Sequence, residues 1–193
     1  MARWHPDAEG RLRQAAVELF AEHGFDNVTV TQIAERAGLT RRSFFRYFPD
    51  KREVLFAGAE RLPAAIAEAI GAVPASTPPL AAVFEGLAGI GTQMVELIDG
   101  IPARRAVIQA SPELQERERT KAAAITTAIR AALVTRAVPS DEAKLLAEVA
   151  TVAFGDAFDR WVGVDGARPF AACLAEGVET LRAALSAMGE TAL

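Results

Sequence analysis

The chain has 193 residues and a formal net charge of −4, and 41 of its residues are alanine, the residue with the highest helix propensity. This composition favours an all-α fold packed through small side chains, and it argues against an all-β protein and against a disordered chain. The single cysteine, Cys173, excludes an intrachain disulfide, and we find neither a signal sequence nor a long apolar stretch, so we expect a cytoplasmic protein.

The first predicted helix covers residues 7–23. Its apolar residues recur at the spacing of one helical face: Leu12, Ala15, Ala16, Leu19 and Phe20. Thr29 and Gln32 have the spacing of a capping box, which predicts the start of a second, short helix that Gly38 ends. Thr40 is then expected to cap a third helix. Two short helices joined through such a turn are typical of a helix-turn-helix.

The third predicted helix has two different faces. Phe44 and Phe48, four residues apart, are expected to point into a small core. The opposite face carries three arginines and one aromatic residue: Arg41, Arg42, Phe45 and Arg46. Arginines on a short exposed face repel one another unless anions neutralise them, and DNA offers phosphates and guanine edges as partners. The pattern predicts a DNA-reading helix, and a solvated basic face is the alternative that it leaves open.

The distribution of charge along the chain agrees with a DNA-reading helix. Residues 1–52 hold nine Lys or Arg against seven Asp or Glu, whereas residues 53–193 hold twelve against eighteen. Four arginines and no acidic residue lie between positions 36 and 49. Because the local field governs contact with phosphates, the negative total does not exclude nucleic acid as a partner of the first segment.

Two segments, TVTQIAERAGLT at residues 29–40 and SFFRYFPDK at residues 43–51, together resemble the DNA-binding domain of TetR-type transcriptional regulators over residues 10–56. The resemblance implies an all-helical homodimer of nine helices that represses transcription until a small molecule binds. It also implies a DNA-binding helix-turn-helix domain at residues 1–52 and an effector-binding and dimerisation domain at residues 53–193. The RRSFFRYF variant is similar to an actinobacterial branch often grouped with acyl-CoA-responsive regulators, so the expected effector is acyl-CoA-like or another apolar compound.

Carried over residue by residue, the resemblance places nine residues at the DNA: Thr29, Thr40, Arg41, Arg42, Ser43, Phe45, Arg46, Tyr47 and Lys51. Thr40, Tyr47 and Lys51 are expected to contact phosphates, Lys51 from the N-terminus of a fourth helix. Arg42 and Ser43 are the expected base-reading residues. Many family members have a tyrosine where this chain has Phe45, so this ring is expected to pack on a sugar or a thymine methyl group.

After residue 51 the sequence shows helical patterns without further motifs. A helix is predicted over residues 50–62, Pro63 is expected to kink or restart it, and it resumes to residue 70, followed by a loop at residues 73–79. Five further helices are predicted: 80–98, 102–110, 112–136, 141–162 and 169–188. Ser140 is expected to cap the fourth of these five. Three glycines are expected either to loosen the first of the five or to allow close packing: Gly86, Gly89 and Gly91.

The second domain carries two predicted sites. Apolar stripes on the last two helices predict a dimer interface, with intrachain core as the alternative: Ala147, Ala150, Phe154, Val178, Leu181 and Leu185. An apolar effector pocket, with core packing as the alternative, is predicted from five residues: Phe84, Met94, Phe154, Phe158 and Trp161. Asp156 and Asp159 face either a cationic ligand or solvent. Arg104 and Arg105 are the expected phosphate partners of an acyl-CoA-like effector.

An enzyme is not expected from this sequence. The two histidines, His5 and His23, belong to no catalytic motif, Cys173 has no histidine near it in the sequence, and neither a P-loop nor a nucleophile elbow is present. No cofactor and no metal site is therefore predicted. The alternative to a ligand-responsive repressor is a DNA-binding architectural or activator protein without a small-molecule effector.

Overall fold

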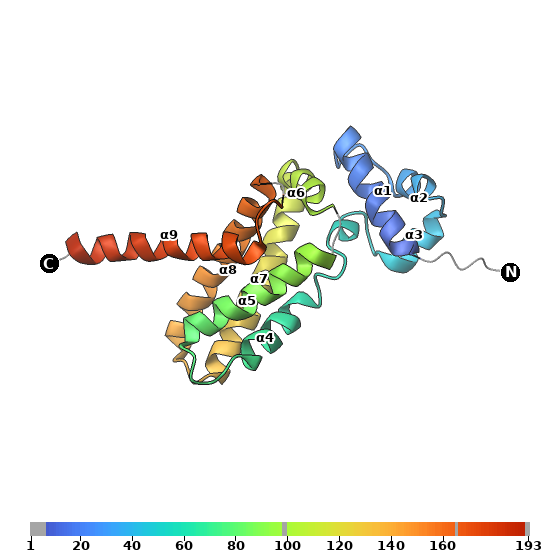
Figure 1. Ribbon diagram of the computed structural model, residues 1–193. Coiled ribbons are helices and arrows are strands. Elements are labelled where there is room, and N and C mark those ends of the chain that lie inside the picture. The colour runs from blue at the N-terminus through green and yellow to red at the C-terminus, as the bar shows by residue number, and fades with distance from the viewer. Residues whose placement is uncertain (1–6, 98–99, 165, 192–193) are drawn as a thin grey trace. The chain divides into compact units, whose positions relative to one another are not determined.

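The computed structural model describes residues 7–97, 100–164 and 166–191. Within these ranges the chain forms nine α-helices and one short 3-10 helix, and no strand, which confirms the all-α prediction (Figure 1). The helices group into two compact units: one contains the described residues up to Glu60 together with Gly100–Lys121, and the other contains Arg61–Asp99 and Ala122–Leu193 as far as they are described. No helix in the described ranges combines the length and hydropathy needed to cross a bilayer.

The first unit contains α1 (Ala8–His23), α2 (Val30–Arg36), α3 (Arg41–Tyr47), the 3-10 helix η1 (Glu53–Leu55), α6 (Ile101–Gln109) and the start of α7 (Pro112–Thr135). Its core confirms the apolar face predicted for the first helix and extends onto α6 and α7. Side chains from these elements that are almost fully buried include Leu12, Phe20, Ile33, Phe44, Phe48, Ile108 and Leu114. This compact unit continues beyond residue 52 to Glu60 and includes Gly100–Lys121, so it is larger than the predicted first domain. A functional domain boundary at residue 52 stays a prediction.

The prediction that a helix begins at Lys51 is wrong. Residues 51–61 form turns and the single 3-10 turn η1, and α4 begins only at Leu62 (Leu62–Ala72). The carboxylate of Asp50 accepts hydrogen bonds from the backbone N–H groups of Arg52 and Glu53, which favours a tight turn over a regular helix. Pro63 lies in the first turn of α4, where its missing N–H removes no helical hydrogen bond, so it starts the helix instead of kinking one.

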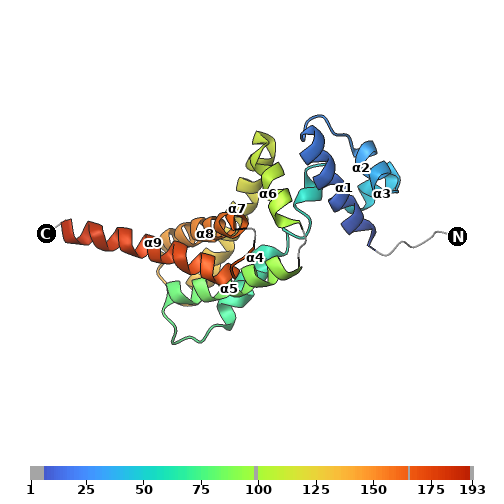
Figure 2. The same ribbon diagram turned by 45° about the horizontal axis from the view of Figure 1, so that its top comes forward.

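The second unit contains α4, α5 (Pro79–Leu97), α8 (Ser140–Gly163), α9 (Phe170–Thr191) and the later part of α7. In this unit α4 packs against α5, and α9 packs against α5 and α8. The C-terminal turns of α9 project past the other helices of the unit in both views (Figures 1 and 2). Their side chains from Arg182 to Ala187 are correspondingly exposed.

Small residues allow close helix packing in this unit, as predicted. A Cβ atom added at Gly91 would lie 2.0 Å from the ring of Phe170 on α9, and one added at Gly86 would lie 3.0 Å from the backbone of Ile70 on α4. The loop at residues 73–78 is held by Arg136, whose guanidinium donates to backbone carbonyls including those of Val73 and Pro74. Gly86 and Gly91 therefore serve close packing, whereas a Cβ atom added at Gly89 would meet nothing within 4 Å.

The predicted cap at the start of α8 is wrong. The N-cap residue is Pro139, which offers no side-chain hydrogen bond, and Ser140 is already the first residue of the helix. The Ser140 hydroxyl instead accepts a hydrogen bond of 2.9 Å from the guanidinium of Arg130 on α7. A serine close to a helix start predicted the approximate boundary but not the role of its hydroxyl.

Candidate nucleic-acid interface

The turn between α2 and α3 has the geometry of a helix C-terminal Schellman motif. Gly38 has the left-handed φ of 65°, the N–H of Leu39 donates to the carbonyl oxygen of Ala34, and the N–H of Gly38 donates to that of Glu35. A residue with a Cβ atom is strained at this φ, so glycine suits the position. This turn ends α2 and fixes the point at which α3 begins.

Both short helices begin with the predicted caps. The Thr29 hydroxyl accepts from the N–H of Gln32 and the Gln32 side chain accepts from the N–H of Thr29, which confirms the capping box. The Thr40 hydroxyl accepts from the N–H of Ser43 at 3.1 Å, and the two hydroxyl oxygens lie 3.0 Å apart. A side-chain cap contributes about 1 kcal/mol to a helix, which matters for helices of only seven residues. Thr29, Thr40 and Ser43 thus have structural roles that are compatible with, but do not require, contact with DNA.

The two faces of α3 are separated as predicted. Phe44 and Phe48 are buried against the core of the first unit, with 0% and 3% of their surface exposed. Phe45 and Tyr47 are exposed, at 46% and 37%. The three arginines of the predicted reading face are exposed as well: Arg41, Arg42 and Arg46.

The guanidinium groups of α3 have no acidic partner among the residues that the structure describes. In the described parts of the chain, no carboxylate lies within 4.0 Å of Arg41, Arg42 or Arg46. By contrast, Arg36 and Arg52 of the same unit are paired with carboxylates at 3.0 and 2.9 Å. The positive charge of this face is therefore available to an external anion.

Aromatic rings orient two of these arginines. The guanidinium carbon of Arg41 lies 5.5 Å from the centre of the Phe45 ring, and that of Arg46 lies 4.8 Å from the centre of the Tyr47 ring. Arg46 also donates a 2.8 Å hydrogen bond to the Tyr47 hydroxyl. These contacts restrict the side chains before any ligand arrives, so less conformational entropy is lost on binding.

Lys51 lies in a different setting from the one predicted. It does not open a helix, and its ammonium group donates to the backbone carbonyls of Phe25, Asp26 and Val28. The motif placed a lysine correctly at this point of the chain, but nothing in the sequence pattern indicated that its donors would be used inside the protein.

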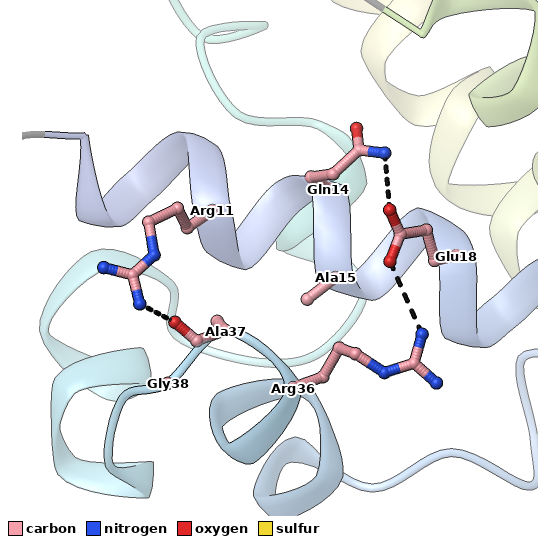
Figure 3. Close-up of a pocket in the computed structure, with 7 residues that line it drawn as sticks. All are labelled: Arg11, Gln14, Ala15, Glu18, Arg36, Ala37 and Gly38. Carbon is pink, nitrogen blue, oxygen red and sulfur yellow. Dashed lines mark hydrogen bonds and ion pairs between the residues drawn. The ribbon is translucent and has the colours of Figure 1, made fainter.

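Two further arginines, which the sequence analysis did not single out, hold α2 against α1 (Figure 3). The guanidinium of Arg11 donates to the carbonyl oxygen of Ala37 at the end of α2. Arg36 is paired with Glu18 and Glu22 of α1, and its hydrogen bond holds the pKa of the Glu22 carboxyl below its usual value. An open hollow of about 350 Å³ lies between the two helices and is lined by Arg11, Glu18 and Arg36 among others. The charged side chains that line it pair with one another and hold the two helices together.

The predicted pocket residues come together in the second unit. Phe154, Phe158 and Phe170 form an aromatic cluster with ring centres 4.6–5.6 Å apart. Phe84, Met94 and Trp161 are half-buried and pack against the same core. A hollow of about 270 Å³ in this unit lies instead between α4 and α5, and none of the five predicted residues lines it. A pocket among these side chains stays a prediction.

The arginines and acids considered for a ligand are engaged within the chain. Arg104 donates to the carbonyl oxygen of Leu55, and burial lowers its pKa from the usual value. Arg105 is paired with Glu118 at 2.6 Å, and both arginines belong to the first unit. Asp156 is paired with Arg160 at 2.5 Å along α8, while Asp159 is exposed.

The structure separates the residues predicted for the dimer interface into two sets. Ala147, Ala150 and Phe154 are buried in the core of the chain itself, which is the intrachain alternative, so these three side chains have almost no surface left for a partner. The three residues on α9 remain accessible, half-buried or exposed: Val178, Leu181 and Leu185. Two other apolar side chains are exposed on α8, and the stripe did not include them: Leu145 and Val152.

Comparison with known proteins identifies the class to which this fold and this helix-turn-helix belong. The family described as bacterial regulatory proteins, tetR family, matches residues 12–57. An uncharacterised HTH-type transcriptional regulator of Mycobacterium tuberculosis is 30% identical over 138 residues, which cover 58% of this chain and 71% of the relative. The chain belongs to the TetR family of transcriptional regulators and is not an enzyme.

Solved structures show the same fold over nearly the whole chain. NalD of Pseudomonas aeruginosa, the secondary repressor of a multidrug efflux pump, has a TM-score of 0.62 at 15% identity and covers 90% of this chain and 93% of its own. FadR of Bacillus subtilis, solved in complex with stearoyl-CoA, has a TM-score of 0.56 at 19% identity, with 89% and 96% covered. At these identities the likeness establishes the all-helical fold and leaves the effector open.

Proposed function

We propose that this protein is a ligand-responsive repressor that binds a palindromic DNA operator as a homodimer and is released by a small apolar effector. The observation that carries the proposal is the exposed face of α3, where Arg41, Arg42 and Arg46 have no carboxylate partner in the described parts of the chain. Like charges held together on seven residues are unfavourable in isolation. Phosphates and the guanine edges of a major groove would neutralise and bind them.

The position of each side chain on α3 suggests its role. Arg41 and Arg42 occupy the first turn, the end that a recognition helix presents to base edges. Arg42 and Ser43 are the proposed base-reading residues, because Arg42 is exposed and no aromatic ring among the described residues stacks on it. Thr40 and Tyr47 carry hydroxyl groups suited to phosphates. Phe45, which lacks a hydroxyl, is suited to a sugar or a thymine methyl group.

A helix of seven residues offers few base contacts, so two copies are needed for specific binding. A two-fold symmetric dimer places two such helices in successive major grooves, about 34–36 Å apart. The accessible apolar residues of α8 and α9 support a dimer in the second unit: Leu145 is 64%, Val152 71% and Leu185 59% exposed. Leu145 and Val152 are seven residues apart and therefore share one side of α8. Exposed apolar side chains that lie together often mark protein interfaces.

The proposed effector site is the aromatic cluster around Phe154, Phe158 and Phe170. Rings and a half-buried methionine, Met94, adapt readily to an apolar guest. The RRSFFRYF segment resembles a branch grouped with acyl-CoA-responsive regulators, and FadR of Bacillus subtilis, similar in fold, was solved with stearoyl-CoA, so acyl chains are the first class to test. An effector that binds the DNA-incompetent state more tightly by about 3 kcal/mol would weaken operator binding about 150-fold. Titrating the protein–DNA complex with acyl-CoA thioesters of increasing chain length tests this class.

The DNA-reading role is tested with Arg42→Ala on a duplex that the wild-type protein has selected from a random-sequence pool. We expect the substitution to cost about 1–3 kcal/mol and to relax specificity at one base pair of each half-site. Fluorescence anisotropy against all single-base variants of the duplex measures both quantities. The matched control is Arg119→Ala, at an exposed arginine of α7 that is paired with Glu116, and this variant should bind like the wild type. If the affinity falls equally for every duplex sequence, Arg42 contacts a phosphate and does not read a base.

A further inference from the structure

Arg46 and Tyr47, at the C-terminal end of α3, hold each other by two separate contacts. The guanidinium of Arg46 donates a hydrogen bond of 2.8 Å to the Tyr47 hydroxyl, and its carbon lies 4.8 Å from the centre of the Tyr47 ring. Both side chains are exposed, and no carboxylate in the described ranges lies within 4.0 Å of Arg46. A cation and a hydroxyl are therefore presented to solvent side by side.

The hydrogen bond between the two side chains leaves both of them with donors to offer. The Tyr47 oxygen accepts from Arg46, so the phenol O–H remains available, and no hydrogen bond joins it to another group of the described chain. A guanidinium has five N–H donors, of which this contact uses one. A hydroxyl that accepts a hydrogen bond from a cation also becomes a stronger donor. The pair suits a ligand that presents several acceptor oxygens close together.

The two ends of α3 offer different chemistry to DNA. Arg41 and Arg42 lie in the first turn, which a recognition helix directs toward base edges. Tyr47 is the last residue of the helix, and in homeodomains this end of the recognition helix contacts the sugar–phosphate backbone. Arg41 also lies over an aromatic ring, but that ring belongs to Phe45 and carries no hydroxyl. The end with the hydroxyl is therefore the end suited to a phosphate, whose oxygens are all acceptors.

We propose that Arg46 and Tyr47 act as one clamp on a single DNA phosphate, the guanidinium and the phenol O–H donating to oxygens of the same group. The proposal rests on the proposed function of α3 and deepens it, because it makes one site of two side chains. Its consequence is that neither residue binds the phosphate well alone. The hydroxyl orients the guanidinium, and the guanidinium strengthens the hydroxyl as a donor.

A double-mutant cycle on the selected duplex tests whether the two residues act together. Tyr47→Phe keeps the ring and removes only the hydroxyl, and Arg46→Gln removes the cation. We expect each substitution to weaken binding about tenfold, and the double variant to bind within about threefold of either single variant. Losses that multiply to about a hundredfold would overturn the clamp, and so would single variants that bind like the wild type.

The matched control for the cycle combines Tyr47→Phe with Arg42→Gln, whose side chains share no contact in the structure, so these two losses should multiply. Replacing one phosphate of the duplex at a time by an uncharged methylphosphonate then locates the clamp. One position in each half-site should weaken the wild-type protein about tenfold and leave both Arg46→Gln and Tyr47→Phe unaffected. If the two variants become insensitive at different positions, or at none, the clamp is wrong.

The contact itself is tested without DNA, because Tyr47 is the only tyrosine of the chain. Tyrosine labelled with carbon-13 at Cζ therefore gives a single NMR signal, from the atom that carries the hydroxyl. Arg46→Gln should shift this signal, and Arg42→Gln should leave it in place. An unchanged signal in Arg46→Gln would contradict the pair even in a protein that selects no duplex, whereas a wild-type protein that selects no duplex would refute the proposed function.

Discussion

At the scale of single residues, Asp50 shows how one carboxylate decides the path of the chain after α3. It accepts hydrogen bonds from the side chain of Arg52 and from the N–H groups of Arg52 and Glu53. The hydrogen bond from the Arg52 side chain, helped by the two backbone N–H groups, holds the pKa of Asp50 below its usual value. Because the pKa is lower in the folded state, ionised Asp50 stabilises the fold above its unfolded pKa, and this contribution disappears as the pH falls through the folded value.

We therefore expect Asp50→Asn to destabilise the protein by about 1 kcal/mol at pH 7. The difference from the wild type should shrink as the pH falls below about 3.9, the ordinary pKa of an aspartate. Urea unfolding of both proteins at pH 7 and at pH 3 measures this convergence. A difference that stays constant over this range would show that the charge of Asp50 does not contribute.

The residue scale also explains what the motif could predict. The caps at Thr29 and Thr40 depend on local spacing, and the structure confirms both. The role of Lys51 depends on a turn 23–26 residues away in the chain, which local spacing does not encode. Sequence separations of 26 and 14 residues likewise explain why the links from Arg11 to Ala37 and from Arg36 to Glu22 were not predicted.

At the scale of elements, Gly91 determines how closely α5 can approach α9. A Cβ atom at this position would lie 2.0 Å from the Phe170 ring, which is itself 1% exposed and cannot move into solvent. We expect Gly91→Ala to destabilise the protein by about 1–3 kcal/mol through overpacking. Urea unfolding followed by circular dichroism measures the change.

The matched control for Gly91→Ala lies two residues away on the same helix. A Cβ atom added at Gly89 would meet nothing within 4 Å, so Gly89→Ala should raise stability by about 0.5–1 kcal/mol through helix propensity alone. Equal effects of the two substitutions would contradict the close contact between α5 and α9.

Element boundaries were predicted well where the pattern was periodic and poorly where side chains bind the backbone. The helices from α5 to α9 begin and end within a few residues of their predicted limits. The helix predicted over residues 51–61 is absent because the hydrogen bonds of the Asp50 turn compete with a helix. The sequence motif, which is typical of a helix beginning at Lys51, gave no sign of this turn. The alanines of α8, Ala147 and Ala150, do not distinguish a subunit interface from an intrachain core by sequence, because small apolar residues suit both equally.

At the scale of the whole molecule, the exposed apolar residues of the second unit define the dimer prediction. The double variant Val152→Glu and Leu185→Glu places two charges on the face proposed to meet a second subunit. We expect it to convert a dimer to a monomer, because burying unpaired carboxylates is strongly unfavourable. Light scattering after gel filtration measures the mass. The control variant Val134→Glu, at a side chain of α7 that is 47% exposed, should remain dimeric. If the double variant is still a dimer, the interface does not include Val152 and Leu185.

The central claim is that two copies of the arginine face of α3 read DNA together. Selection from a random-sequence duplex pool by the full-length wild-type protein, followed by sequencing of the bound fraction, tests it most directly. We predict an inverted repeat whose half-site centres lie about one helical turn apart, roughly 10 base pairs, or a multiple of that spacing. A bound fraction with no enriched sequence, or with a single unrepeated site, would contradict the claim.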